Sequence, residues 1–181
     1  MILSDFDLLN FINSKRLKIE PFTADIVREN GIDFRLADEI AHHKKLEDGF
    51  VMDPSDEKMI ERSYDIQKGL DKLIINPHEQ VLLSTIEYVE IPDDIVGIVE
   101  LRSTWARHGL SMPPTIIDAG FKGTVTLEVI NNAPNGIFLR PETRFAHIVF
   151  IKTTSRVEKS YATGSYSGQR GIKLPKAITS D

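Results

Sequence analysis

The hydrophobic pattern of the N-terminal segment changes from the period of a helix to that of a strand. Ser4 and Asp7 have the spacing of a capping box, and Leu3 and Leu8 have that of a hydrophobic staple, so a helix is predicted to begin at Ser4. In residues 32–36, apolar and charged side chains alternate. This period of two predicts a strand with one polar face.

A charged segment separates this strand from a long region that is rich in short apolar runs. Residues 38–72 carry ten acidic and six basic side chains, which predicts a solvated excursion with short strands such as Phe50–Met52. Beyond it, turn residues separate expected strands at 73–75, 81–85, 88–91, 95–101, 124–130, 137–139 and 145–151. Such closely spaced strands are typical of an antiparallel sandwich or barrel, so a mainly β fold is predicted.

Length and charge restrict the class of protein. A chain of 181 residues suits a single domain over 1–181, and its 41% of apolar residues is enough for a core. A net charge of −5 argues against binding to nucleic acid or to an anionic membrane. The sequence has no apolar run of about 20 residues and no secretory signal pattern, so the cytoplasm is the expected location.

The absence of cysteine excludes several kinds of chemistry. Disulfides, thiolate catalysis and cysteine-bound zinc cannot occur, and the five histidines do not form an H-x-x-x-H or H-x-E pattern. No residue is therefore predicted to bind a metal. An enzyme of this composition is expected to use carboxylates, arginines and hydroxyls.

The C-terminal segment has a charge opposite to that of the whole chain. Residues 152–176 contain six basic side chains and one acidic one, together with many Gly, Ser, Thr and Tyr residues. This composition favours an arm that meets an anionic group. A frayed terminus is the alternative.

The first candidate site follows the apolar run 95–101. In the segment 102–107, Arg102 and Arg107 flank the hydroxyls of Ser103 and Thr104, where a strand is expected to give way to a short helix. Backbone N–H groups and guanidinium groups there could bind phosphate or carboxylate. The alternative is a solvated helix with ordinary surface arginines.

Two carboxylates complete the candidate chemistry. Asp118 lies beside a turn that contains Gly120 and Gly123, where it could accept a hydrogen bond from a sugar hydroxyl; an ordinary turn is the alternative. Glu128 lies among apolar neighbours in the run 124–130. Burial would raise the pKa of Glu128, as a general base near neutral pH requires. A strand glutamate in a surface salt bridge is the alternative.

Three motifs follow one another in a fixed order. They are Arg-Ser-Thr-Trp-Ala-Arg-His-Gly-Leu at 102–110, Ile-Asp-Ala-Gly-Phe-Lys-Gly at 117–123, and Thr-Leu-Glu at 126–128. Together they resemble the dCTP deaminase branch of the dUTPase-like superfamily. The resemblance extends to segments 30–36, 141–150 and 161–169, and it is closest to archaeal members, which share the stretch 113–121.

The resemblance implies a dUTPase-like distorted β-barrel or jelly roll with a short N-terminal helix and an extended C-terminal arm. Residues 152–181 would form this arm and act as a lid. The resemblance also implies a homotrimer whose active sites lie between subunits.

The resemblance further implies a role for each candidate residue. Glu128 would take a proton from the water that attacks C4 of cytosine and deliver it toward the ring and the departing ammonia, while Ser103 and Arg107 hold the water and the glutamate. Asp118 would hold the deoxyribose hydroxyl, and Tyr161 and Gln169 would close over the nucleotide. The implied nucleotide-binding residues are Arg102, Ser103, Thr104, Trp105, Ala106, Arg107, Asp118, Thr126, Leu127, Glu128, Tyr161 and Gln169.

The implied reaction converts dCTP to dUTP without zinc. The common nucleobase deaminases activate water with zinc held by His and Cys beside a glutamate, and this chain has no cysteine for such a site. Mg²⁺ is expected only as an ion carried by the triphosphate, without protein ligands. Feedback by dTTP is left open.

The chain departs from the family pattern at four places. The stretch Ser111–Ile116 is shorter than usual and contains two prolines. His147 stands where Gln is common, Ser165 where Lys often reaches a phosphate, and Trp105 where a smaller aliphatic side chain is usual.

Three rival functions remain from the sequence. A dUTP diphosphatase could use Asp118 to orient water, but the tail lacks the Gly-rich, Phe-bearing motif that stacks on uracil. A bifunctional enzyme would make dUMP from dCTP. A non-catalytic nucleotide-binding trimer would have no evident need for Glu128.

Overall fold

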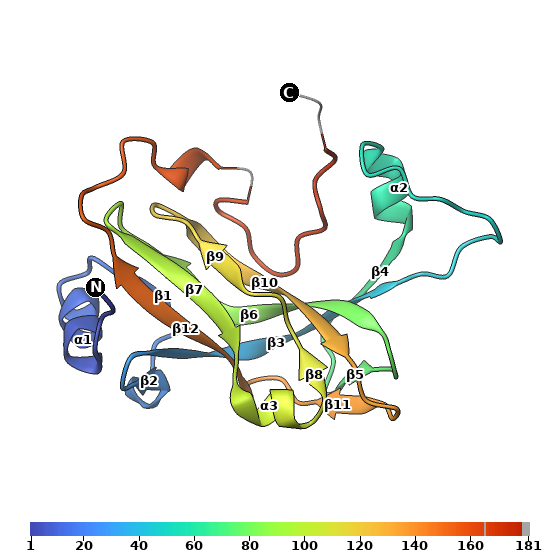
Figure 1. Ribbon diagram of the computed structural model, residues 1–181, viewed down its shortest axis with the longest axis horizontal. Coiled ribbons are helices and arrows are strands. Elements are labelled where there is room, and N and C mark those ends of the chain that lie inside the picture. The colour runs from blue at the N-terminus through green and yellow to red at the C-terminus, as the bar shows by residue number, and fades with distance from the viewer. Residues whose placement is uncertain (165, 179–181) are drawn as a thin grey trace.

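The protein, obtained as a computed structural model that describes residues 1–164 and 166–178, is built mainly from β-strands (Figure 1). Its elements are α1 (Asp5–Asn13), β1 (Lys18–Glu20), η1 (Ala24–Ile26), β2 (Val27–Arg28), β3 (Gly31–His43), α2 (Glu57–Arg62), β4 (Tyr64–Gln67), β5 (Leu73–Ile75), β6 (Gln80–Glu90), β7 (Ile95–Leu101), α3 (Ser103–Arg107), β8 (Leu110–Ser111), β9 (Thr115–Ile117), β10 (Lys122–Asn131), β11 (Ile137–Leu139), β12 (Arg144–Lys152) and η2 (Tyr161–Thr163).

One antiparallel sheet forms the body of the molecule. Within the described residues it has ten strands, and its main order is β8-β10-β6-β3-β12-β7-β9. Strand β1 pairs with β6, and β2 and β4 pair with β3, while β5 and β11 form a separate ribbon. The long strands curve around a common interior (Figure 1), so the predicted mainly β, barrel-like fold is confirmed.

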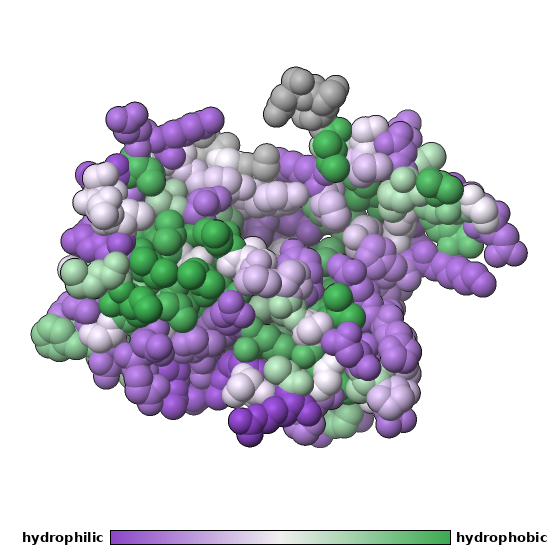
Figure 2. Space-filling view, in the orientation of Figure 1, coloured by the Kyte–Doolittle hydropathy of each residue, from purple (hydrophilic) through white to green (hydrophobic). Residues whose placement is uncertain are grey.

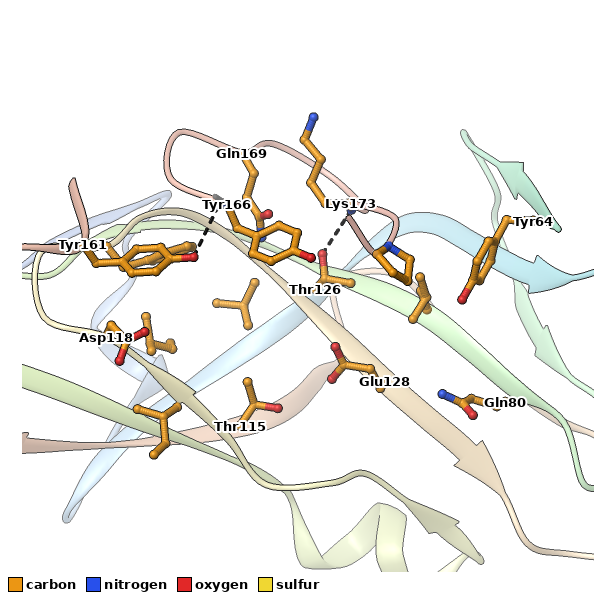
Figure 3. Close-up of a pocket in the computed structure, with 16 residues that line it drawn as sticks. Tyr64, Gln80, Thr115, Asp118, Thr126, Glu128, Tyr161, Tyr166, Gln169 and Lys173 are labelled. Atoms are coloured by element: carbon orange, nitrogen blue, oxygen red, sulfur yellow. Dashed lines mark hydrogen bonds between the residues drawn. The ribbon is translucent and has the colours of Figure 1, made fainter. Parts of the chain in front are cut away.

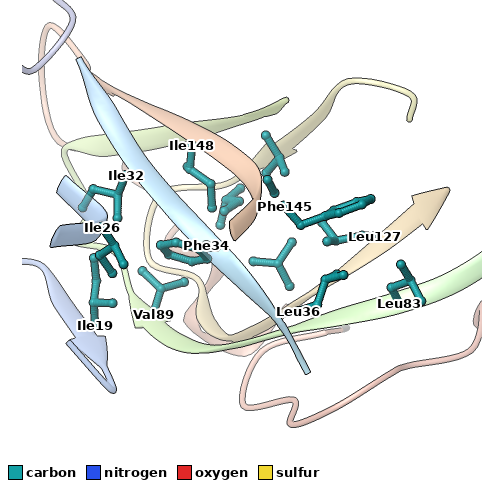
Figure 4. Close-up of a cluster of buried hydrophobic side chains, with 14 of the residues drawn as sticks. Ile19, Ile26, Ile32, Phe34, Leu36, Leu83, Val89, Leu127, Phe145 and Ile148 are labelled. Carbon is teal, nitrogen blue, oxygen red and sulfur yellow. The ribbon is translucent and has the colours of Figure 1, made fainter. Parts of the chain in front are cut away.

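Alternate side chains of these strands fill the interior. Phe34 from β3 and Phe145 and Phe150 from β12 are fully buried, and Leu83 and Leu127 reach the same cluster from β6 and β10 (Figure 4). Burying a large apolar side chain stabilises a fold by about 1.5–3 kcal/mol, so this cluster fixes the strands that carry the candidate site.

The N-terminal helix begins as the sequence predicts. The Oγ of Ser4 accepts a hydrogen bond from the Asp7 backbone N–H at 3.3 Å, and the Ser4 backbone N–H donates to Asp7 Oδ2 at 3.2 Å. This reciprocal pair satisfies two backbone groups that a helix start leaves free.

Several strands have the bounds expected from the sequence, and two expectations are wrong. The segments expected at 81–85 and 88–91 are one strand up to Glu90, β6, because Glu87 between them is buried rather than exposed in a turn; Ile91 lies beyond the end of this strand. The carboxylate of Glu87 accepts hydrogen bonds from Arg35 Nε at 2.6 Å and from the Arg35 backbone N–H at 2.8 Å, so the charged residue is accommodated inside the sheet.

Phe50–Met52 does not form a strand. The nearby end of β3 already pairs with β4 on one side and β6 on the other, so it offers no free edge to this segment. The charged excursion instead contains α2, where Asp56 Oδ1 accepts hydrogen bonds from the backbone N–H groups of Lys58 at 2.9 Å and Met59 at 3.2 Å. In the part of the chain that the structure describes, no helix is long and apolar enough to cross a membrane.

Candidate active site

Glu128 lies on β10, between β6 and β8, and points away from the core. Leu127 and Val129 turn inward and are buried, while Thr126 and Glu128 line a cavity of about 330 Å³ on the other side of the strand (Figure 3). The predicted period of two holds from 126 to 130. At the start of the run it is interrupted, because the register shifts between Thr124 and Thr126, and Val125 is buried and also lines the cavity. The side chain of Leu127 is 1% exposed and belongs to the core, so only its main chain can contribute to the cavity side.

The cavity is formed by strands on one side and by the C-terminal tail on the other. Strands β4, β6, β9 and β10 supply Tyr64, Gln80, Thr115 and Glu128, among others. The tail supplies Tyr161, Tyr166, Gln169, Lys173 and Pro175. Segments that are distant in the sequence thus surround the Glu128 carboxylate (Figure 3).

Burial changes the proton affinity of Glu128. Desolvation raises the pKa of Glu128 above its ordinary value, and hydrogen bonding to its own backbone N–H and to the Thr115 hydroxyl opposes this rise. Within the described residues, no basic side chain forms an ion pair with Glu128. The upward shift of the Glu128 pKa predicted from the sequence is therefore present, and it makes the carboxylate a stronger base than an exposed glutamate.

Gln169 brings an unused hydrogen-bond acceptor to the cavity. It is 7% exposed, and its Nε2 donates to the backbone oxygen of Thr124 at 2.7 Å. Its Oε1 is buried and, within the described residues, has no hydrogen-bond partner. A buried polar atom without a partner is rare in proteins, so this oxygen lacks an acceptor interaction that a donor from a ligand would supply.

Tyr161 is held in the wall of the cavity by the turn after β9. The Tyr161 backbone N–H donates to the oxygen of Ala119 at 3.0 Å, and its ring lies 6.1 Å from that of Phe121. Gly120, with a φ of +87°, makes this approach possible because a Cβ there would collide with Ser160 Oγ. Asp118, in the same turn, is exposed at the rim of the cavity.

The residues from Arg102 to Arg107 lie elsewhere in the same chain. Arg102 Nε is 3.2 Å from Asp33 Oδ2, and these two residues line a second, open hollow together with Ser103, Thr104 and His147. The side chains of Ser103, Thr104, Ala106 and Arg107 are exposed on α3. One chain therefore does not bring Ser103 or Arg107 into the cavity of Glu128, and their predicted roles stay predictions.

Trp105 packs against the body of the molecule. Its Nε1 donates to the backbone oxygen of Arg144 at 2.9 Å, and its ring lies 5.7 Å from that of Phe145. These contacts fix the orientation of α3 on the end of β12. They account for a large aromatic residue at this position without any contact to a nucleotide.

Sequence reasoning missed two residues that contact or face Glu128. Thr115 is one, and its only sequence signal is a hydroxyl directly after Pro113 and Pro114. Tyr64 is the other, because burial and the charge of Glu128 both raise its pKa. It lies in the charged excursion, where no strand that could reach the cavity was expected.

Comparison with known proteins gives the family. Residues 2–153 match the family described as dCTP deaminase-like. The chain belongs to this family. It is 46% identical to the dCTP deaminase of Saccharolobus solfataricus over 176 aligned residues. This alignment covers 97% of this chain and 92% of that protein. It is 43% identical over 181 residues to the dCTP deaminase of Pyrobaculum aerophilum, covering 100% of this chain and 99% of the relative.

Solved structures show the same fold. The crystal structure of a 2'-deoxycytidine 5'-triphosphate deaminase from Agrobacterium tumefaciens matches with a TM-score of 0.64 at 19% identity, over 82% of this chain and 46% of that one. A dUTPase of phage 80alpha matches with a TM-score of 0.50 at 14% identity, over 80% and 94% of the two chains. The fold predicted from the resemblance, a dUTPase-like one, is therefore confirmed.

The departures from the family pattern can be placed in this fold. The shortened stretch Ser111–Ile116 leads into β9, which carries Thr115 to the cavity. His147 lies beside α3, where its Nδ1 is 2.9 Å from Asp33 Oδ1. Ser165 lies outside the described residues.

Proposed function

We propose that this protein is a dCTP deaminase, which hydrolyses dCTP to dUTP and ammonia. The observation that carries the proposal is Glu128, a half-buried carboxylate with a raised pKa and, within the described residues, no ion-pair partner. The relatives from Saccharolobus solfataricus and Pyrobaculum aerophilum, which match over nearly the whole chain, support the same reaction.

In the proposed mechanism Glu128 moves protons between water and substrate. Its carboxylate takes a proton from water as the water oxygen bonds to C4 of cytosine. Glu128 delivers that proton to the ring nitrogen next to C4. It then takes the proton of the new C4 hydroxyl and passes it to the amino group, so that a C4 carbonyl forms, the bond between C4 and the exocyclic nitrogen breaks and ammonia leaves. A positioned general base of this kind contributes about 10²–10⁴ in rate.

The cavity offers complementary groups to a deoxynucleotide. The main chain from Thr126 to Glu128 would line the base, and Asp118 at the rim would accept a hydrogen bond from the deoxyribose hydroxyl. Tyr161 and Gln169 would close over the nucleotide, with the free Oε1 of Gln169 as an acceptor for it. In this proposal residues 152–181 are the lid of a single domain that spans 1–181.

We further propose that a second subunit completes the site. Arg102 and Arg107, at the two ends of α3, would bind the triphosphate, but neither lines the cavity in one chain. A patch of apolar side chains covers the outer face near β7 and β9 (Figure 2), where Ile116 is 64% exposed. Such patches mark protein interfaces, so this face supports a homotrimer in which Ser103 and Arg107 approach Glu128 of a neighbour.

The proposed reaction involves Mg²⁺ only as part of the substrate. The ion would accompany the triphosphate and neutralise its charge, without a ligand from the protein. Zinc is not part of the proposal, because the chain has no cysteine and Glu128 can supply the base. Neither nucleic acid nor a membrane is a proposed partner, the cytoplasm stays the expected location, and feedback by dTTP stays untested.

Product analysis with dCTP and Mg²⁺ tests the proposal. The expected products are ammonia and dUTP in equal amounts, with little pyrophosphate. Release of dUMP and pyrophosphate in step with ammonia would instead indicate a bifunctional enzyme. Hydrolysis of dUTP with dCTP left intact would reject the deaminase, and tight nucleotide binding without any product would favour a non-catalytic trimer.

A further inference from the structure

A buried carboxylate outside the cavity contacts the C-terminal tail. Glu39 on β3 is 5% exposed, and its Oε1 accepts hydrogen bonds from Ser84 Oγ at 2.6 Å and from the Ile172 backbone N–H at 2.8 Å. Lys68 Nζ lies 3.4 Å from Oε2. A buried carboxylate is unfavourable without hydrogen-bond donors, and the tail supplies one of the donors to Glu39.

The tail is shaped to approach this carboxylate closely. Gly171 has a φ of +69°, and a Cβ at this position would lie 2.5 Å from Glu39 Oε1. A side chain at 171 would therefore force the Glu39 carboxylate and the tail apart, and either movement disturbs the hydrogen bond between them. The next side chain, Ile172, is 7% exposed and packs with Ala41, Ile60, Tyr64 and Leu82.

The contact lies between two residues that line the Glu128 cavity. Gln169 and Lys173 flank Gly171 and Ile172 in the sequence, and both line that cavity. Further hydrogen bonds hold the same segment to β10. The backbone N–H of Lys173 donates to Thr126 Oγ1 at 3.2 Å, and Thr124 Oγ1 donates to the Gly171 oxygen at 3.4 Å.

We propose that Glu39 is a latch for the C-terminal tail, a positioning residue that holds segment 169–173 against β10. Through this latch Gln169 and Lys173 stay in the cavity, so the inference rests on the proposed nucleotide site. Only molecules with the tail docked can bind a nucleotide with the complete cavity. The apparent affinity is therefore reduced by the fraction of molecules with the tail released.

Trypsin tests the latch in the full-length protein without nucleotide. Arg170 and Lys173 are cleavage sites within the held segment, so the initial rate of cut formation there measures tail release. Two variants break the contact from opposite sides, Glu39→Ala from the sheet and Gly171→Ala from the tail. The second leaves the strands intact, so it remains informative if the first variant unfolds.

Two control variants match these changes. Asp38→Asn alters an exposed carboxylate next to Glu39 on the same strand. Gly168→Ala introduces a side chain at a φ of +80°, a comparable backbone strain, but its Cβ would meet nothing within 4 Å. The two glycine variants are compared by the cut after Lys173, because both keep the Lys173–Leu174 bond, and the difference there reports the collision with Glu39.

If Glu39 is a latch, trypsin should cleave Glu39→Ala and Gly171→Ala about tenfold faster than the controls. The thermal midpoint of Gly171→Ala should stay close to that of Gly168→Ala. The KM for dCTP should rise by a similar factor, while kcat is largely kept. Wild-type cleavage rates in both variants would overturn the latch, whether or not dCTP is the substrate. Faster cleavage with an unchanged KM would overturn its role in positioning the cavity.

Discussion

The cavity around Glu128 and the surface around α3 are two parts of the candidate site with opposite physical character. The first is enclosed by four strands and the tail, and its carboxylate has a raised pKa. The second exposes Ser103, Thr104 and Arg107, and its neighbouring hollow is open. One chain therefore builds a sheltered place for proton transfer and leaves its candidate phosphate-binding groups facing outward.

The difference has a simple physical explanation if subunits share their active sites. A carboxylate needs burial to become a base near neutral pH, and a single fold can supply that burial. A triphosphate carries several charges, and guanidinium groups are suited to reach it from a second surface. The structure of one chain then contains two halves that meet only in an assembly.

The largest expected effect comes from disabling the enclosed half. Glu128→Gln keeps the size and most hydrogen bonds of the side chain but removes the base, so turnover of dCTP should fall by about 10²–10⁴. Binding of dCTP should change little, because the glutamine still fills the same place. Steady-state kinetics and equilibrium binding measure the two quantities.

A charge-matched control separates chemistry from electrostatics. Glu90→Gln also removes one negative charge, but Glu90 lies at the end of β6 and pairs with Lys18 and Lys122. Its turnover should stay close to that of the wild type. If Glu128→Gln kept more than about a tenth of the activity, the role of Glu128 as general base would be wrong.

The next effect tests whether the two halves come from different chains. Arg107→Ala and Glu128→Gln should each be nearly inactive as pure proteins. When equal amounts are unfolded and refolded together, random assembly should restore about a quarter of the wild-type activity, since a quarter of the shared sites contain both intact halves. Coupled ammonia release measures the recovery.

The control for this experiment is mixing Ser103→Ala with Arg107→Ala, which alter the same half. Their mixture should remain as inactive as the two separate proteins. Activity that returns in neither mixture, although sedimentation shows mixed assemblies, would mean that Arg107 and Glu128 act within one chain or not in one site.

Local patterns were sufficient to predict much of the fold. The capping residues Ser4 and Asp7 gave the start of α1, and the apolar runs at 73–75, 95–101 and 137–139 have the bounds of β5, β7 and β11. The alternation around Glu128 also gave its orientation and the direction of its pKa shift. Each of these features is determined by residues that are close in the sequence, so a local pattern is enough to predict it.

Features that depend on distant partners could not be predicted in this way. The sequence pattern around Glu87 indicated a break between two strands, because a charged residue is unexpected inside a sheet. Its partner, Arg35, lies on another strand, and a local pattern does not reveal that pairing. The contact of Thr115 with Glu128 likewise depends on how β9 is placed over β10. The resemblance to a family supplied site residues from α3, but one chain places α3 away from the Glu128 cavity, and the proposed approach through a neighbouring subunit is not visible in a local sequence pattern.

A smaller effect is expected from changing the proton affinity of the enclosed half. The Thr115 hydroxyl lowers the pKa of Glu128, so Thr115→Val should raise that pKa further. Because the base must be deprotonated, the acid limb of the pH profile of kcat/KM should move to higher pH. Thr104→Val, on α3, should alter the KM for dCTP without moving this limb. A limb that stays in place in Thr115→Val would show that another group controls it.

The smallest expected effect concerns stability. The pKa of Glu128 is higher in the folded protein than in an unfolded chain, so the folded state retains this proton to higher pH. Stability should therefore decrease as the pH rises from the unfolded value of about 4 through the raised folded value. At neutral pH the ionised carboxylate is destabilising, and Glu128→Gln should have a higher thermal midpoint than the wild type. At pH values below the unfolded pKa both side chains are neutral, so the difference between the two proteins should shrink.

Asp118→Asn, at the exposed rim of the same cavity, should show no comparable gain. Calorimetry over this pH range measures the effect, and a Gln variant that is less stable at neutral pH would mean that the carboxylate has a stabilising partner in the assembled protein.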